Sequence, residues 1–436
     1  MIIKHIHARQ ILDSRGNPTI ECEVKLENGI VGWAAVPSGA STGKYEAVEL
    51  RDNDQKNYNG LSVLRAVENV NAQIIKAVVG VDVSNQEKVD ALMIEMDGTE
   101  NKGKLGANAI LSVSLATARA AANFEKKPLY EYLTKYNSDF NGKYIMPIPE
   151  MNVINGGKHA NWATDIQEYM LFPVGAKSIS EAIRMNVEVY QVLKGIIKRQ
   201  GYVTTVGDEG GFAPNVKSNE EPFQLLSEAI SKAGYKLGVD IVFGIDSAST
   251  EFYQDGKYKL NKEGRVVTSD ELAKFFEKLA LKYPIISMED IFAEDDWDAF
   301  RKFTESNGDK IQVVGDDLYV TNVNRLNRGI QKKTTNSILI KLNQIGTLTE
   351  TIDAILTARK NGMTAIISHR SGETEDAFIA DFAVAMGTGQ IKTGAPARSE
   401  RVAKYNQLLR IEEKLGEKAV FAGMQLFKRD LSKMFF

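Results

Sequence analysis

Residues 241–246 read IVFGID, a short apolar run that ends on a carboxylate, and the repetition of this pattern decides the fold. Residues 284–289 (PIISME) and 311–316 (IQVVGD) end in the same way. The runs at 337–341, 364–369 and 389–392 end instead on a basic residue or a histidine. Short apolar runs that alternate with amphipathic helical segments are typical of a parallel sheet or barrel.

The spacing of these runs predicts a closed barrel. After the first interval they recur about every 25 residues, which is the length of one strand–helix–strand step. Helices are expected to open at Ser180, at Ser269 and near Thr347, where a hydroxyl can cap free N–H groups. Two earlier apolar runs, 148–154 and 169–174, raise the number of predicted strands from six to eight. In a (β/α)₈ barrel the strand ends meet on one face, so we expect a common pocket for Asp246, Glu289, Asp316, Lys341, His369 and Lys392.

The first part of the chain has a different pattern of polar and apolar residues. Residues 19–26 alternate polar and apolar side chains and lead through 27–29 (ENG) into residues 30–33, which is a β-hairpin signal. Apolar residues recur at helical spacing over 63–77, and 108–122 is an alanine-rich helical run. We therefore predict a smaller α+β domain over residues 1–138 and a barrel domain over residues 139–436.

Composition restricts the classes of function. The chain has 436 residues, and its 54 Lys and Arg against 57 Asp and Glu leave a net charge of −3, which offers no overall attraction to nucleic acid. The single cysteine, Cys22, can form neither an internal disulfide nor a zinc cluster. No apolar run reaches the roughly 18 residues that a membrane span needs, and the N-terminus has no signal-peptide core. A cytoplasmic location is the expectation.

The three strand-end acids form a candidate metal site. Asp246, Glu289 and Asp316 offer only hard oxygen ligands, which suit Mg²⁺ better than zinc. The alternative is that each acid faces solvent or makes a structural salt bridge. Three such acids on successive strands, followed by Lys, His and Lys, favour the metal site.

Lys341 ends the apolar run 338–340 and is either a surface group or a buried base. Close to bound Mg²⁺ and to a second cation such as Lys392, its neutral amine is favoured, so its pKa is expected to fall toward a range in which it accepts protons.

Two glycine-rich segments are candidate active-site loops. Residues 207–214 (GDEGGFAP) place Asp208 and Glu209 in a flexible setting between two helical patterns, although an acidic turn of this kind is often only a turn. Residues 38–44 (SGASTGK) resemble a nucleotide-binding P-loop but have three residues between the glycines and Tyr45 after the lysine, so nucleotide binding is rejected. We interpret them as a polar lid, with an ordinary surface loop as the alternative.

Two histidines stand just past strand ends. His159 follows residues 155–158 (NGGK), and His369 precedes Arg370, Ser371 and Gly372. An isolated histidine is more often structural than catalytic. Arg370 and Ser371, at the opening of a helix expected after Gly372, combine guanidinium charge with free N–H groups and are expected to hold a phosphate.

The chain resembles the enolase family over essentially its whole length. The stretches that carry the resemblance are 11–18 (ILDSRGNP), 36–43 (VPSGASTG), 105–115, 207–214, 287–297, 314–322, 338–351, 368–376 and 390–409. The resemblance implies an α/β fold with an N-terminal α+β domain and a barrel of ββαα(βα)₆ order. Residues 160–164 (ANWAT) and 59–61 (NGL) depart from the family pattern at positions that bear on lid closure and rate, whereas the metal and base residues match it.

By the same resemblance, the chain is expected to be a carbon–oxygen lyase of glycolysis and gluconeogenesis that interconverts 2-phospho-D-glycerate and phosphoenolpyruvate. Lys341 would be the base and Glu209 the acid, and Asp246, Glu289 and Asp316 would hold one Mg²⁺. A second Mg²⁺ would arrive with substrate and bind with the help of Ser41 in the lid. The remaining site residues implied are Glu168, His159, His369, Gln167, Arg370, Ser371 and Lys392.

Two other functions stay open at this stage. One is another acid-sugar dehydratase or racemase on a similar barrel, which would not need the Arg370 and Ser371 phosphate site. The other is a non-catalytic structural or surface-binding use of the scaffold, in which at least one of the catalytic residues would be lost. The resemblance further implies a homo-oligomer, at least a dimer, with octamers in some bacterial members.

Overall fold

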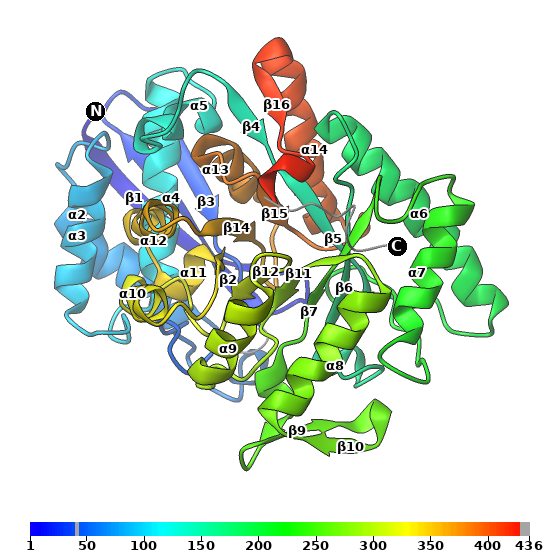
Figure 1. Cartoon of the computed structure of the whole chain (residues 1–436). Coiled ribbons are helices and arrows are strands. Elements are labelled where there is room, and N and C mark those ends of the chain that lie inside the picture. The colour runs from blue at the N-terminus through cyan, green and yellow to red at the C-terminus, as the bar shows by residue number, and fades with distance from the viewer. Residues whose placement is uncertain (40–42, 428–436) are drawn as a thin grey trace.

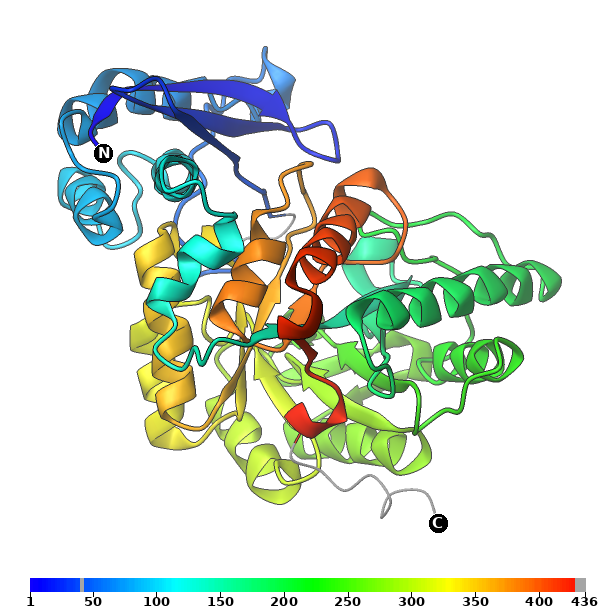
Figure 2. The same cartoon turned by 90° about the horizontal axis from the view of Figure 1, so that it is seen from above.

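The computed structural model describes residues 1–39 and 43–427, and of His159 only the backbone. Figure 1 shows an N-terminal part in blue and cyan and a barrel in green to orange, and from above the N-terminal part lies against one side of the barrel (Figure 2). A small N-terminal domain followed by a barrel confirms the predicted fold class. The boundary after residue 138 stays a prediction.

An antiparallel sheet begins the chain, in the order β1 (Ile3–Leu12), β2 (Pro18–Leu26), β3 (Val31–Ala35). The predicted hairpin is the β2–β3 pair, and Gly29 in its turn has a φ of +87°, which glycine adopts without strain. The helices of this part are α1 (Leu64–Glu68), α2 (Ile75–Val78), α3 (Gln86–Asp97), α4 (Ala107–Phe124) and α5 (Leu129–Leu133). The helix predicted over 63–77 is one helical segment whose middle, η2 (Asn69–Ile74), is a π-helix.

Helix α4 packs closely on β2 and β3 because its residues are small. A Cβ atom on Gly32 of β3 would lie 2.1 Å from the backbone nitrogen of Ala120 and 2.5 Å from the carbonyl oxygen of Ala116. Only a glycine opposite alanines permits this approach. The alanine-rich run therefore serves to bury a helix directly on the sheet.

Eight strands close into the barrel, as the sequence predicts. In spatial order they are β11 (Ile285–Glu289), β12 (Gln312–Gly315), β13 (Ser337–Ile340), β14 (Thr364–Ser368), β15 (Gln390–Lys392), β5 (Ile148–Asn155), β6 (Glu168–Phe172) and β7 (Val242–Asp246). Strand β6 is antiparallel to both of its neighbours, whereas the other pairs are parallel.

The helices around the barrel complete the ββαα(βα)₆ order. They are α6 (Ile179–Arg199), α7 (Glu221–Lys232), α8 (Ser269–Lys282), α9 (Trp297–Asn307), α10 (Val323–Lys332), α12 (Leu348–Lys360), α13 (Phe378–Met386) and α14 (Ser399–Leu415), with the short α11 (Leu342–Ile345) after β13. The helices predicted to open at Ser269 and near Thr347 are confirmed, and they are capped by the side chains of Thr268 and Thr347. The helix predicted to open at Ser180 begins at Ile179, because the side chain of Ser178 is the one that caps it.

Minor sheets and short helices complete the fold. Two minor sheets pair β8 (Tyr253–Gln254), β9 (Lys257–Leu260) and β10 (Arg265–Val267), and β4 (Tyr144–Met146) with β16 (Ala419–Phe421). The remaining short helices are η1 (Tyr58–Gly60), η3 (Thr134–Tyr136), η4 (Gly157–Ala160), η5 (Ser249–Phe252), η6 (Asn261–Glu263), η7 (Gly416–Lys418) and η8 (Met424–Leu426).

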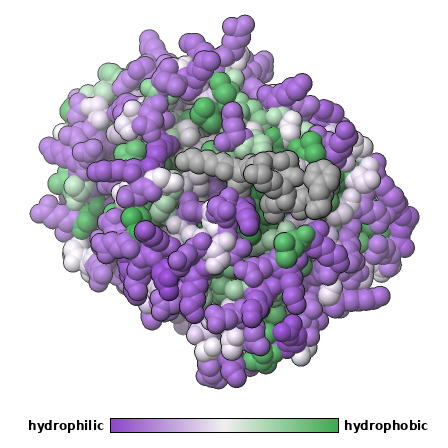
Figure 3. Space-filling view, viewed as in Figure 1, coloured by the Kyte–Doolittle hydropathy of each residue, from purple (hydrophilic) through white to green (hydrophobic). Residues whose placement is uncertain are grey.

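The face of the molecule seen in Figure 3 is mostly hydrophilic, and its hydrophobic side chains lie in small separate patches. Within the ranges 1–39 and 43–427, no helix combines the length and the apolar character that crossing a membrane requires.

Candidate functional site

The carboxyl ends of the barrel strands surround one cavity. Asp246 and Glu289 end β7 and β11, Asp316 and Lys341 directly follow β12 and β13, and Lys392 ends β15. The predicted residues that line the cavity are Gln167, Glu168, Glu209, Asp246, Asp316, Lys341, His369, Arg370, Ser371 and Lys392. The convergence expected from the strand pattern is therefore present, and Glu289 joins it through its contact with Lys392.

Strand β6 delivers its first residues to this face because it runs in the opposite direction to the other strands. Glu168 is in register with Asp246 of β7 and with Asn155 of β5. The backbone nitrogen of Gln167 donates to the carbonyl oxygen of Asp246 at 3.0 Å. A parallel strand would have placed Gln167 and Glu168 at the opposite end of the barrel.

Lys392 is a buried cation among the strand-end carboxylates. Its Nζ lies 3.0 Å from Asp246 Oδ2, 3.0 Å from both oxygens of Glu289 and 3.1 Å from Glu168 Oε2. Burial alone would lower the pKa of Lys392, but attraction to these carboxylates outweighs it and holds the pKa well above its ordinary value. Lys392 therefore stays charged in this arrangement.

Lys341 is paired with Asp316. Its Nζ donates to Asp316 Oδ2, while Gln344 donates to Asp316 Oδ1 at 2.9 Å. Burial would lower the pKa of Lys341, but the Asp316 carboxylate more than offsets it, so the pKa lies above its ordinary value. This direction is opposite to the fall in pKa expected beside Mg²⁺, because the Asp316 carboxylate pairs with the lysine.

The carboxylates of the site exceed what these lysines can neutralise. Asp290, Asp316 and Asp317 bring carboxylate oxygens within 4.8 Å of one another. Burial, together with repulsion from neighbouring acids, raises the pKa of the Glu289, Asp290 and Asp317 carboxyls well above the usual range. A buried set of oxygen donors with excess negative charge fits a divalent cation such as Mg²⁺.

His369 and Glu209 face each other across the cavity. His369 Nε2 lies 3.8 Å from Glu209 Oε1, and Glu209 Oε2 accepts a 2.9 Å hydrogen bond from Asn152 of β5. Burial lowers the pKa of His369 well below its ordinary value, and the nearby cation Arg401 lowers it further against the pull of Glu209. The glycine-rich loop 207–214 thus places Glu209 inside the cavity, as expected.

Arg370 pairs with a carboxylate from the N-terminal domain. Its Nη1 lies 2.9 Å from Glu46 Oε2 and its Nη2 3.2 Å from Glu46 Oε1, and both side chains are buried. Asn343 also accepts from Arg370 Nη1, at 2.9 Å. Arg370 lines the cavity with Ser371, so a guanidinium and a hydroxyl, groups that bind anions, lie at its wall.

The expectation that a helix opens after Gly372 is wrong. Helix α13 begins at Phe378, and residues 369–377 form a loop that is buried except at Glu375 and, in part, Ala377. Lys404 Nζ binds Glu373 Oε2 at 2.8 Å, and Arg119 pairs with Asp376, so side chains from two other helices hold the segment out of helical geometry. Ser371 therefore does not lie at a helix N-terminus.

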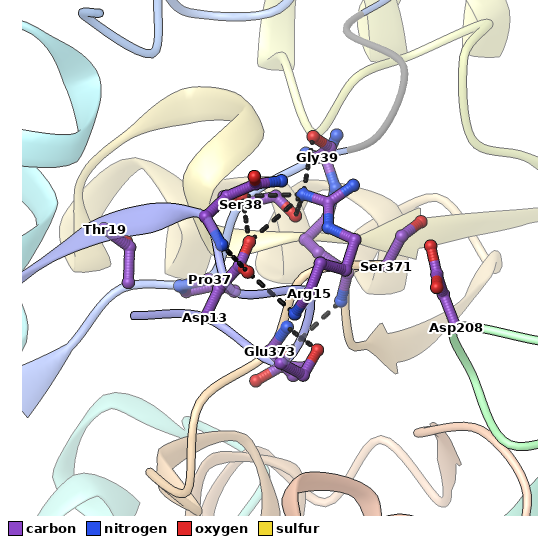
Figure 4. Close-up of polar contacts among 12 residues, drawn as sticks. Asp13, Arg15, Thr19, Pro37, Ser38, Gly39, Asp208, Ser371 and Glu373 are labelled. Carbon is purple, nitrogen blue, oxygen red and sulfur yellow. Dashed lines mark hydrogen bonds and ion pairs between the residues drawn. The ribbon is translucent and has the colours of Figure 1, made fainter. Parts of the chain in front are cut away.

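The segment that leads into the predicted lid is fastened to this loop (Figure 4). Ser38 and Gly372 exchange two backbone hydrogen bonds of 2.7 and 2.9 Å. Asp13 Oδ2 accepts from Ser38 Oγ at 2.9 Å, and Arg15 Nη2 donates to the same hydroxyl at 2.8 Å and to Gly39 O at 3.1 Å. The lid residue Ser41 lies outside the described residues. For His159 the structure describes only its backbone, in η4.

Several side chains of the site carry no signal that the sequence analysis used. Asp290 and Asp317 directly follow Glu289 and Asp316, so the doubled acids could have been noticed. Glu46 lines the cavity from a distant loop, and Arg401 of α14 contacts His369, which lines it; no local pattern marks either residue.

Two family models match the chain. One, described as the enolase C-terminal TIM barrel domain, matches residues 143–430, and the other, described as the enolase N-terminal domain, matches residues 3–133.

Proposed function

The chain belongs to the enolase family, and from this premise we propose that it interconverts 2-phospho-D-glycerate and phosphoenolpyruvate. The observation that carries the proposal is the convergence in one cavity of Lys341, Glu209 and the carboxylates of three neighbouring barrel strands. A lyase of this type needs a base, an acid and stabilisation of negative charge at one site.

Lys341 is proposed as the base that removes the C2 proton of 2-phosphoglycerate. The electron pair of the C2–H bond moves toward the substrate carboxylate and then forms the C2–C3 double bond as the C3 hydroxyl leaves. Glu209 is proposed to protonate that hydroxyl, so that it departs as water. Lys341 and Glu209 both line the cavity, which supports this division of roles.

Stabilising the developing charge is the most demanding step of the reaction, because removal of the C2 proton adds negative charge to a substrate carboxylate that is already ionised. Lys392 is buried and held cationic, and it is proposed to stabilise this charge. Asp246, Glu289 and Asp316 are the proposed ligands of one Mg²⁺, and Ser41 is a proposed contributor to a second that binds with substrate. When bound, Mg²⁺ would supply Lewis-acid stabilisation of the substrate carboxylate.

Arg370 and Ser371 are proposed to bind the phosphate. Their guanidinium and hydroxyl offer charge-assisted hydrogen bonds to its oxygens. Gln167, Glu168 and His369, which line the same cavity, are proposed to contact the substrate, together with His159. A homo-oligomeric state, at least a dimer, and a cytoplasmic location remain predictions from the resemblance and the composition.

The proposal is tested by following the ultraviolet absorbance of the enol phosphate product after 2-phosphoglycerate and Mg²⁺ are added to the purified chain. We expect turnover that stops on addition of a chelator and returns with excess Mg²⁺. An unphosphorylated acid sugar serves as the comparison substrate and should not be dehydrated. Turnover that ignores the chelator, or equal activity on the unphosphorylated acid, would count against the proposal.

A further inference from the structure

Arg401 is a fully buried arginine for which the proposed reaction has no role. It lies in the first turn of α14, and its side chain is 0% exposed. Its Nη1 donates to the carbonyl oxygen of Arg370 at 2.5 Å and contacts His369 Nδ1 at 2.6 Å. Its Nη2 donates to the carbonyl oxygens of Ser371 at 2.6 Å and Asp208 at 3.2 Å. One guanidinium thus joins the loop after β14 to the loop that carries Glu209.

The contact with His369 determines where the imidazole carries its proton. A guanidinium has five N–H donors, no acceptor, and does not lose its proton in proteins. His369 Nδ1 must therefore accept the hydrogen bond, which leaves the single ring hydrogen on Nε2. The low pKa of the buried His369 agrees with a neutral ring.

The other side of the ring faces the proposed acid. His369 Nε2 lies 3.8 Å from Glu209 Oε1, and Asn152 already donates to Glu209 Oε2. Catalytic hydrogen bonds are often long before substrate binds and tighten afterwards. An Nε2–H group in this position can donate to Glu209 and fix its orientation, whereas an Nδ1–H tautomer would present only a lone pair to it.

Close packing holds the Arg401 guanidinium against the His369 imidazole. Gly394 has a φ of +82°, and a Cβ atom there would lie 3.1 Å from Arg401 Cδ and 3.2 Å from His369 Cε1. The backbone at Gly394 therefore lies close to both side chains, with no room between for a larger residue. The contact between Arg401 and His369 has little room to rearrange.

We propose that Arg401 is a positioning residue that holds His369 as the neutral Nε2–H tautomer and thereby orients Glu209 for proton transfer. The tautomer follows from the contacts alone. The consequence for catalysis rests on the proposed function.

The first test needs no activity, and it uses a variant only to assign the signals. In the full-length protein labelled with ¹⁵N-histidine, the ring nitrogens report the tautomer, and a His369→Gln sample assigns the signals among the four histidines. We expect at pH 7 a protonated Nε2 and an unprotonated Nδ1 for His369. A protonated Nδ1, in either the neutral or the cationic ring, would overturn the proposal.

The second test separates proton removal from loss of water. In Arg401→Gln we expect dehydration of 2-phosphoglycerate to fall by about 10–100-fold, with kcat affected more than KM. Exchange of the C2 proton with solvent should persist, because Lys341 is untouched. Arg401→Lys should keep part of the activity, since its ammonium retains the positive charge and can donate to His369 Nδ1. Exchange and dehydration falling in parallel would contradict the positioning role.

A matched control lies one turn further along α14. Lys404 is also a fully buried cation that holds the loop after β14, through Glu373 Oε2 and Thr374 O, but no contact joins it to His369 within the described residues. Lys404→Met should therefore leave the His369 ¹⁵N pattern unchanged. A shift of that pattern as large as in Arg401→Gln would overturn the proposal. If wild-type protein fails to turn over 2-phosphoglycerate, the proposed function is wrong, but the ¹⁵N measurement still determines the tautomer of His369. If Arg401→Gln does not fold, the ¹⁵N measurement on wild-type protein alone tests the proposal.

Discussion

Lys392 Nζ lies 3.0 Å from Asp246 Oδ2, although the two residues are 146 positions apart in the chain. Each ends a barrel strand, and closure of the barrel brings those ends together. One buried lysine surrounded at such short range by several carboxylates leaves a net negative charge at the site. Such a charge is the electrostatic setting that a divalent cation requires.

Removal of a strand-end carboxylate should remove most of the stabilisation by metal. Wild-type protein is expected to melt at a higher temperature in Mg²⁺ than in chelator, because a ligand at 100 times its Kd adds about 2.7 kcal/mol to the free energy of unfolding. Glu289→Gln should lose most of this increment, because the amide offers no negative charge. Glu305→Gln, at an exposed position of α9, is the matched control. A full Mg²⁺ response in Glu289→Gln, measured by thermal unfolding, would contradict the assignment.

Truncation of the proposed base should stop exchange at C2. We expect Lys341→Ala to fold and bind metal but to exchange the C2 proton of 2-phosphoglycerate with deuterated solvent about 10²–10⁴-fold more slowly, because no other amine is proposed to take that proton. Lys102→Ala removes another buried lysine that pairs with a carboxylate, Glu350, at 2.9 Å, and it should keep exchange. Retained exchange in Lys341→Ala, followed by mass spectrometry, would remove Lys341 as the base.

The positions of the strand-end residues could be predicted from sequence because they follow one rule. Apolar runs that end on Asp246, Glu289 or Asp316 converge whenever parallel strands close into a barrel. Glu168 obeys a different rule, since it begins an antiparallel strand, and only the family resemblance indicated it. Arg401 acts through contacts with loops far from it in sequence, and no local pattern encodes such contacts.

The failed prediction of a helix after Gly372 has a physical cause of the same kind. The sequence offers polar residues that could cap a helix, but Lys404 and Arg119 bind Glu373 and Asp376 instead. Ion pairs between distant elements override a local preference. The reversed direction of the Lys341 pKa shift has a related cause, because the lysine pairs with Asp316, 25 positions away in the chain.

A buried glutamate below the site should make stability depend on pH. Glu150 accepts a hydrogen bond from Gln390 Nε2, and burial raises its pKa to about 8. Because the folded state disfavours the ionised form, its stability is lost progressively as pH rises from the ordinary carboxyl range through about 8. Glu150→Gln keeps an acceptor for Gln390 and removes this penalty. Relative to wild type, its melting temperature should therefore gain more at pH 9 than at pH 5.

The control for this pH effect is Glu413→Gln, which makes the same chemical change at an exposed position of α14. Thermal unfolding of the three proteins at both pH values gives the comparison. An identical difference between Glu150→Gln and wild type at pH 5 and pH 9 would show that the Glu150 carboxyl does not titrate as its burial implies.

Two glycine substitutions should change stability in opposite directions. Gly32→Ala forces a methyl group into the backbone of α4 and should lower the free energy of unfolding by about 1–3 kcal/mol or more. Gly195→Ala lies at an exposed position of α6 with no atom near the added methyl, and should raise it by about 0.5–1 kcal/mol. Urea denaturation measures both. Equal stability of the two variants would contradict the close packing of α4 on β3.

The metal coordination sphere in a crystal grown with Mg²⁺ and phosphoenolpyruvate is the decisive measurement for the proposed site. We expect oxygens of Asp246, Glu289 and Asp316 at about 2.0–2.1 Å from one Mg²⁺, with Lys341 Nζ released from Asp316 and directed at C2 of the ligand. Carboxylates that remain bound to Lys341 and Lys392, with Mg²⁺ held elsewhere on the chain, would contradict the mechanism.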